Sequence, residues 1–245
     1  MLQGPRLLLS GDSAIVVEFG DGIDVRINTR VRLLHHALGA AAHAGIVETV
    51  PTYRSLMVHY DPMVLPREAL EDVIITTAGR LPEEVREPVR TVKIPVTYGG
   101  EAGPDLADVA AAAAVDEQAV VDLHAGGDYV VFMLGFMPGF PYLGGLPPRL
   151  ATPRLATPRT LVPAGSVGIA GAQAGIYPTE SPGGWRLIGR TPIRLFDPLR
   201  SPPTLLEAGD HVRFVPITQT DYDAIARQVV AGTYCPAIRV GSGGS

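Results

Sequence analysis

The sequence is poor in the residues that usually build metal and disulfide sites. Its 245 residues include a single cysteine, Cys235, which excludes an internal disulfide and a cysteine-based structural zinc site. His35, His36 and His43 lie on or beside one expected helix, but without the spacing of a metal-binding helix that has an intervening glutamate. We therefore expect no metal ligand set in this chain.

The signatures of several self-sufficient enzymes are also missing. There is no phosphate-binding GxxxxGK[ST] loop, which excludes an independent P-loop ATPase. Gly165, Gly168 and Gly171 give the spacing GxxGxxG, which is not the dinucleotide fingerprint. Ser166 does not have the flanks of a nucleophile elbow, and no acidic pair stands at catalytic spacing. The catalytic residues are therefore unknown, and the chain resembles half of a composite enzyme.

Charge and hydropathy limit the kinds of molecule that the protein is expected to bind. The formal net charge is −5, and Lys and Arg do not cluster outside residues 135–192. Both observations argue against nucleic-acid binding. The N-terminal MLQGPRLLLSGDS holds only a short leucine run, too brief for a signal peptide or a membrane span. We expect a cytoplasmic protein that does not bind membranes.

Residues 135–192 are the informative stretch, with 11 Gly and 10 Pro. Large apolar residues such as Phe136, Phe140 and Trp185 stand between them, which favours a packed structure over a disordered linker. The stretch carries five arginines and one acid, Glu180, inside an acidic chain. A small anion or an acidic partner is expected to bind here, with a turn-rich β core that has no active site as the alternative.

The first part of the chain is expected to be an α+β domain over residues 1–88, with ferredoxin-like connectivity. Asn28 or Thr29 is expected to cap its first helix, and Pro66 stands at the start of the second. The expected strands cover 14–19, 46–50 and 54–60, and the expected helices cover 31–44 and 66–77.

Residues 89–240 are expected to form a closed or nearly closed β-barrel, followed by a flexible tail at 241–245. Asp105 and Asp116 are expected to cap two consecutive helices. The expected strands cover 93–98, 128–134, 193–196, 204–206 and 211–217, and a last helix covers 221–230. His124 falls in the last turn of the helix that Asp116 begins, where a protonated, capping imidazole is favoured over a catalytic one. It is also a candidate for binding the substrate or another anion.

The polar residues of the stretch form a candidate anion site. Arg159 and Arg190 have the chemistry to clamp a carboxylate or a phosphate. Gly183 and Gly184 allow close backbone approach and an anion-binding nest. Four further side chains are candidates for orienting an amide or a carbonyl: Ser166, Gln173, Tyr177 and Ser181. Turn formation and barrel closure are the alternative explanation for each of these residues.

One short segment is duplicated: LATPR at 150–154 recurs at 155–159. Each arginine follows a proline, so the chain is expected to be extended and to turn Arg154 and Arg159 to opposite faces. One of them would then face a site and the other solvent. The duplication leaves Arg154 doubtful as a site residue.

Four segments of the chain resemble the KipI family, which is also called the PxpB family of 5-oxoprolinase subunits or allophanate hydrolase subunit 1. The resemblance runs over nearly the whole chain and is closest from 93 to 217. These segments are YGGEAGPDL, DLHAGGDYVVFMLGFMPGFPYLGGL, PRTLVPAGSVGIAGAQAGIYPTESPGGWRLIGRTPIRLFDP and GDHVRFVPI.

The resemblance implies an N-terminal α+β domain joined to a cyclophilin-like β-barrel. It also implies a KipA/PxpC-like partner subunit, in an expected heterotetramer, and a PxpA-like subunit. Such a complex opens 5-oxoproline, a small anion, to glutamate with ATP, whose site is not visible in this chain. The alternatives are a subunit that handles urea- or biotin-linked carboxyl groups, and a KipI-like inhibitor of a histidine kinase.

Overall fold

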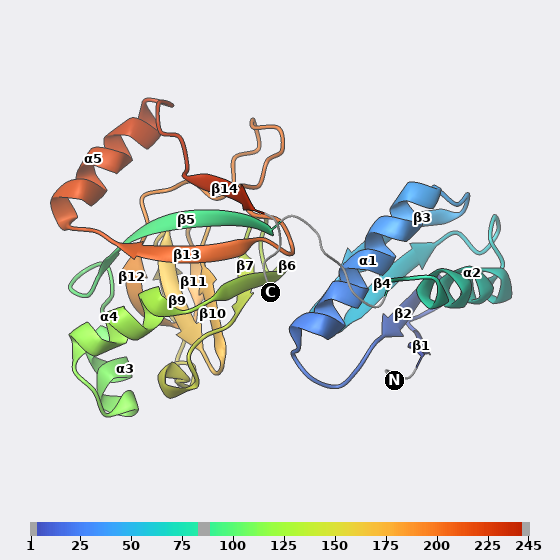
Figure 1. Ribbon diagram of the computed structural model, residues 1–245, viewed down its shortest axis with the longest axis horizontal. Helices are drawn as coiled ribbons and strands as arrows, with labels where there is room; N and C mark the ends of the chain where they lie inside the picture. Colours follow the sequence, from blue (N-terminus) through green and yellow to red (C-terminus); the bar gives the residue numbers. More distant parts are fainter. Residues whose placement is uncertain (1–3, 83–88, 242–245) are drawn as a thin grey trace. The chain divides into compact units, whose positions relative to one another are not determined.

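The computed structural model describes residues 4–82 and 89–241. They belong to two compact units, Met1–Arg86 and Glu87–Ser245 (Figure 1). The expected boundary at residue 88 and residues 242–245 of the expected tail lie outside the described residues, whereas Gly241 ends a strand. Within the described ranges, no helix combines the length and the apolar character that a membrane crossing requires.

The first unit is a four-stranded antiparallel sheet with the order β1-β2-β4-β3, covered by two helices. Along β4, Leu56, Val58 and Tyr60 are buried and alternate with half-buried residues, so one face of the sheet carries the core. Both helices contribute buried residues to that same core. The elements are β1 (Arg6–Leu9), β2 (Ala14–Glu18), α1 (Val25–Ala41), β3 (Ile46–Pro51), β4 (Ser55–Tyr60) and α2 (Arg67–Gly79).

The three expected strands and the second helix of this unit are confirmed, but the start of the first helix is wrong. Helix α1 begins after Asp24, whose carboxylate accepts a hydrogen bond from the backbone N–H of Arg26 at 2.7 Å. Asn28 is therefore inside the helix, where it is buried and donates to the backbone carbonyls of Thr52 and Tyr53. The sequence offered several capping residues in a row, and tertiary contacts used Asn28 for another purpose.

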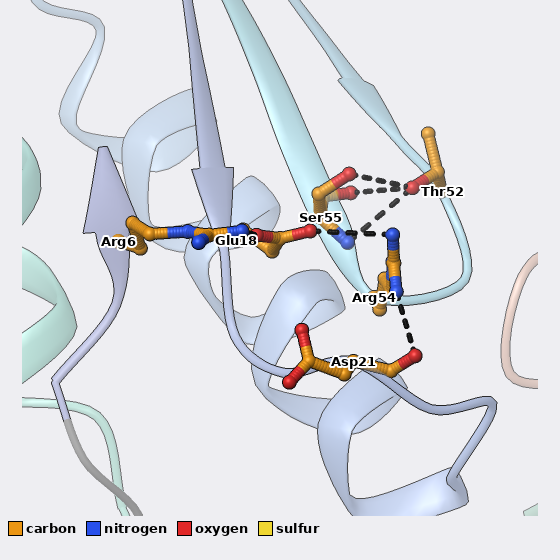
Figure 2. Close-up of polar contacts among 6 residues, drawn as sticks. All are labelled: Arg6, Glu18, Asp21, Thr52, Arg54 and Ser55. Carbon is orange, nitrogen blue, oxygen red and sulfur yellow. Dashed lines mark hydrogen bonds and ion pairs between the residues drawn. The ribbon is translucent and has the colours of Figure 1, made fainter. Parts of the chain in front are cut away.

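A polar cluster in this unit ties β1 and β2 to the β3–β4 turn (Figure 2). The Glu18 side chain is 10% exposed and pairs with the guanidinium groups of Arg6 and Arg54. Arg54 also donates to the backbone oxygen of Asp21 at 2.6 Å, and Thr52 and Ser55 bond to one another across the turn. The carboxylate is satisfied within the cluster, and we therefore interpret the cluster as a structural clamp.

The second unit contains a closed barrel of seven strands (Figure 1). The order is β12-β9-β10-β7-β6-β13-β5, and β5 pairs back with β12 to close it. The pair β13–β5 is parallel, and β14 (Ile238–Gly241) adds to the other side of β5. The strands are β5 (Val89–Tyr98), β6 (Tyr129–Leu134), β7 (Pro141–Gly144), β9 (Ser166–Ala170), β10 (Gln173–Ile176), β12 (Arg186–Arg190) and β13 (His211–Pro216).

The expected barrel is thus confirmed, and four of its strands come from the Gly/Pro-rich stretch. A separate ribbon of β8 (Arg159–Val162) and β11 (Ser181–Gly183) lies in the same stretch. Two expected strands are wrong: 193–196 and 204–206 make only an isolated bridge between Phe196 and Thr204.

The helices of the second unit are α3 (Leu106–Ala113), α4 (Glu117–Gly126) and α5 (Gln219–Val230), with a short 3-10 helix η1 (Pro148–Leu150). Asp116 caps α4 as expected, accepting from the backbone N–H of Ala119 at 2.7 Å. Thr218 and Asp221 cap α5 reciprocally. The expected cap at Asp105 is wrong, because its carboxylate makes no bond to the start of α3 and turns to the barrel instead.

Candidate functional site

A second apolar cluster lies on the outer face of the barrel, apart from its core. Consecutive residues of a strand point to opposite faces, and Ile169 and Ile188 belong to the barrel core. Their neighbours Ala170 and Leu187 therefore point outward, where they join an aromatic cluster. The remaining buried members of that cluster are Phe140, Val162, Tyr177 and Trp185.

This aromatic cluster forms the floor of a pocket of about 270 Å³. Glycine is required beneath it: a Cβ added at Gly175 would lie 2.9 Å from the rings of Phe140 and Trp185. The rings pack edge to face, with Phe140 and Trp185 centroids 5.5 Å apart at 85°. The lining residues are Phe136, Phe140, Tyr142, Arg154, Pro158, Tyr177, Pro182, Gly183, Gly184 and Trp185.

The rim of the pocket carries an aromatic side chain on strained backbone. Phe136 has a φ of +62°, a conformation that costs a bulky residue energy. Its side chain gains little burial in return, since 64% of the residue is exposed. Its ring packs edge to face on Phe140, with centroids 5.6 Å apart. A strained backbone that exposes an aromatic ring beside a pocket is typical of a binding site.

Arg154 is the positively charged residue of the pocket lining. Its guanidinium carbon lies 5.9 Å from the centroid of the Trp185 ring. It is close enough to Tyr142 and Tyr177 to oppose the rise in pKa that burial causes in both phenols. Burial remains the larger cause, so the pKa of each phenol is raised and both stay protonated at neutral pH.

The second arginine of the duplicated segment has a different environment. Arg159 donates from Nη2 to Oδ1 of Asp105 at 2.7 Å, and the Asp105 side chain is only 6% exposed. The other oxygen of Asp105 accepts from the backbone N–H of Leu187 at 2.7 Å. The two arginines of the duplicated segment therefore have different contacts, because Arg154 lies over Trp185 and Arg159 pairs with a buried acid. Both are close enough to Tyr177 to affect its pKa, so their predicted orientation to opposite faces stays a prediction.

The remaining polar candidates are dispersed. Arg190 donates from Nε to the backbone oxygen of Ala164 at 2.8 Å, and Arg159 pairs with Asp105, so each arginine of the predicted clamp has a partner within the chain. Ser166 is buried and donates to the backbone oxygen of Pro163 at 2.7 Å. Gln173 begins β10 half-buried, and Ser181 donates to the backbone oxygen of Pro182 at 3.1 Å.

Three predicted residues do line the pocket: Tyr177, Gly183 and Gly184. Neither glycine has a positive φ, so the anion-binding nest expected there is wrong. Gly183 is small for another reason, because an added Cβ would collide with the phenol of Tyr177. The sequence pointed to these residues but not to Phe136, Tyr142 and Trp185, whose signal was the aromatic content of the stretch.

His124 lies in the barrel core and not at the pocket. Its Nδ1 is 2.8 Å from the Tyr98 hydroxyl, and its ring packs on Tyr129 and Phe214. Complete burial lowers the pKa of His124 to about 3, so the imidazole is neutral at physiological pH. The protonated imidazole expected at the end of α4 is therefore wrong, since desolvation outweighs the helix dipole.

The pocket on the outer face of the barrel does not fit ATP, which the family resemblance implies for the working complex. The pocket holds one guanidinium among its lining residues, too little positive charge for a triphosphate. Within the described ranges, no three His, Cys, Asp or Glu side chains come together in a group that could hold a metal ion without a nucleotide. The pocket suits a small, singly charged ligand with a flat or apolar body.

Comparison with known proteins places this geometry in a family. The family model for the carboxyltransferase domain, subdomain C and D, matches residues 5–206 of this chain. The chain is 44% identical to the 5-oxoprolinase B subunit of Bacillus subtilis, over 87% of this chain and 93% of the relative. It is 45% identical to the 5-oxoprolinase B subunit of Escherichia coli, over 88% of this chain and 97% of the relative.

A solved structure, that of TTHA0988, agrees with a TM-score of 0.75 and 40% identity over 84% of this chain. The chain spans 40% of the length of TTHA0988. The sequence motifs, the barrel and these matches lead to one conclusion. The chain belongs to the carboxyltransferase subdomain C and D family and, within it, to the KipI/PxpB family of 5-oxoprolinase subunits.

Proposed function

We propose that this chain is the PxpB-type subunit of an ATP-dependent 5-oxoprolinase, which opens 5-oxoproline to glutamate. The observation that carries the proposal is the 44% identity to a 5-oxoprolinase B subunit over 93% of that relative. The pocket on the outer face of the barrel supports it, because its single guanidinium and aromatic floor suit a small cyclic anion.

The chemistry defines what this chain contributes. A lactam is a stable amide, and its hydrolysis becomes easier once the carbonyl oxygen is phosphorylated. The described pocket residues offer no thiol, imidazole or carboxylate that could attack or exchange protons at neutral pH. The contribution of this chain is therefore binding and orientation of the substrate, and we expect it to be inactive alone.

Other subunits complete the site. Because the described pocket does not fit ATP, we assign the nucleotide to a KipA/PxpC-like partner or to a PxpA-like subunit. The greater length of TTHA0988 supports a permanent association of this domain with further polypeptide. We expect a heterotetramer with the KipA/PxpC-like subunit, in the cytoplasm, where ATP is available. We also propose that the first domain (1–88) is ferredoxin-like and that the barrel domain (89–240) is cyclophilin-like.

Reconstitution tests the proposal directly. The purified chain is mixed with its KipA/PxpC-like and PxpA-like partners, and glutamate release from 5-oxoproline is followed with and without ATP. We expect ATP-dependent release that disappears when this chain is omitted. A well-assembled complex that releases no glutamate would contradict the proposal.

The name of the matching family, carboxyltransferase domain, favours one second candidate. A subunit that handles carboxyl groups on urea or biotin would turn over carboxylated biotin or a urea derivative in the same assay. A KipI-like regulator would turn over neither and would instead bind a histidine kinase tightly. Each alternative thus has a positive result that 5-oxoprolinase activity does not give.

A further inference from the structure

We propose that Arg154 binds the carboxylate of the substrate, and that the aromatic floor of the pocket holds its ring. The site then selects a small cyclic monoanion. The identity of that anion as 5-oxoproline rests on the proposed function, whereas the site itself rests on the geometry of the pocket.

The first argument is that Arg154 has no acidic partner among the residues that the structure describes. Arg159 and Arg186 on neighbouring segments each pair with an acid, Asp105 and Asp108, at 2.7 and 2.6 Å. Arg154 has no such ion pair within the described part of the chain, and its side chain is exposed over an aromatic wall. A guanidinium held beside an apolar surface without a counter-ion is well suited to bind a carboxylate from outside.

The second argument is that the backbone around Arg154 is fixed. On one side, the backbone oxygen of Thr152 accepts from the N–H of Gly171 at 2.8 Å. On the other side, the N–H of Leu155 donates to the oxygen of Gly184 at 2.8 Å, and Gly184 lines the same pocket. Arg154 therefore projects from a segment anchored at both ends, which lowers the entropy lost when it binds an anion.

The third argument is size and shape. The pocket volume of about 270 Å³ is at or below the range of roughly 300–1,000 Å³ found for drug-sized ligands. A ligand no larger than one amino acid is expected. The five aromatic residues of the lining offer flat apolar surface for a five-membered ring, and the protonated phenols of Tyr142 and Tyr177 are donors for a lactam carbonyl.

The test combines a change in the protein with a change in the ligand. In the reconstituted complex, Arg154→Ala is expected to raise the KM for 5-oxoproline by about 10- to 100-fold, the loss expected for one hydrogen-bonded charge pair. Arg154→Lys should restore part of it. The control Arg239→Ala removes another exposed charge, from β14 and outside the pocket, and should leave KM unchanged. Gel filtration checks that each variant still assembles.

The ligand change is 2-pyrrolidinone, which has the lactam ring but no carboxylate. Its inhibition constant should be the same for wild type and Arg154→Ala, because only the carboxylate meets the guanidinium. Wild-type KM in Arg154→Ala would overturn the inference while leaving the proposed function intact. Equal weakening of 5-oxoproline and 2-pyrrolidinone would also overturn it, since Arg154 would then only shape the pocket.

A binding measurement separates the site from the activity. Trp185 is the single tryptophan of the chain and lies in the pocket, so its fluorescence reports on occupancy. If the complex does not turn over 5-oxoproline, the proposed function fails. The inference then stands only if 5-oxoproline or another small cyclic carboxylate changes Trp185 emission in wild type and not in Arg154→Ala. The absence of any such change would overturn it.

Discussion

The pair of Arg159 and Asp105 allows a quantitative test of whether Arg159 is a structural residue or a substrate clamp. The carboxylate is 6% exposed and the arginine side chain 28% exposed, so the pair is largely withdrawn from water. Removing one partner of a buried pair costs about 3–5 kcal/mol, because the other charge stays buried without compensation. The partial exposure of Arg159 reduces this, and we expect Arg159→Ala to lower the free energy of unfolding by about 3 kcal/mol.

Asp105→Asn separates the charge from the hydrogen bond. The amide oxygen of asparagine is still able to accept from the backbone N–H of Leu187, so only the pairing with Arg159 is lost. We expect a cost of about 2 kcal/mol, and a coupling energy of at least about 1.5 kcal/mol between the two sites in the double variant. Denaturant unfolding followed by Trp185 fluorescence measures all four proteins, because this side chain is buried in the same unit.

The same proteins decide between the two roles. If Arg159 were a substrate clamp, Arg159→Ala would keep its stability and lose affinity for 5-oxoproline. Unfolding free energies within about 0.5 kcal/mol of wild type, or strictly additive single effects, would refute the structural role. They would return Arg159 to the binding site.

Two other predictions concern the barrel. Burial lowers the pKa of His124 to about 3 in the folded protein, whereas its pKa in the unfolded chain is about 6.5. Below pH 6.5 the unfolded chain therefore binds a proton at His124 that the folded protein does not bind. The free energy of unfolding is therefore unaffected by His124 above about pH 6.5. Between pH 5.5 and 4 it should fall by about 1.4 kcal/mol per pH unit more in wild type than in His124→Leu, and equal slopes of unfolding free energy against pH would contradict this. Gly175→Ala should destabilise the barrel by about 1–3 kcal/mol, because the new Cβ would crowd Phe140 and Trp185. The control Gly126→Ala meets no atom within 4 Å and should be neutral or stabilising; similar losses for both glycines would contradict the crowding argument.

Much of the fold could be predicted from local patterns. Alternation of apolar residues located β4, and Asp116 located the start of α4, because both signals depend on neighbours in sequence. The glycines and prolines of the stretch indicated turns, and its aromatic residues indicated a core. The strands at 193–196 and 204–206 failed because a short apolar run does not say whether a neighbouring strand is available to pair with it.

The candidate site was harder to predict because it depends on long-range pairing. Asp105 has a capping sequence, but Arg159, 54 positions away, and the backbone of Leu187 use its carboxylate. The same long-range contacts distinguish the two arginines of the duplicated segment. Arg159 pairs with Asp105, whereas Arg154 lines the pocket. Two identical pentapeptides thus have different roles for reasons that no local rule contains.

The parallel contact between β13 and β5 has a consequence for the birth of the protein on the ribosome. Strand β13 enters the barrel between β6 and β5, and its partner residues in β5 lie about 120 positions earlier, as in the pair His211 and Thr91. Until residues 211–216 have been synthesised, the barrel has a gap at the position of β13, and the edges of β6 and β5 that face this gap are unpaired. All residues of the first unit are synthesised long before this, so we expect the two units to fold at different times during synthesis.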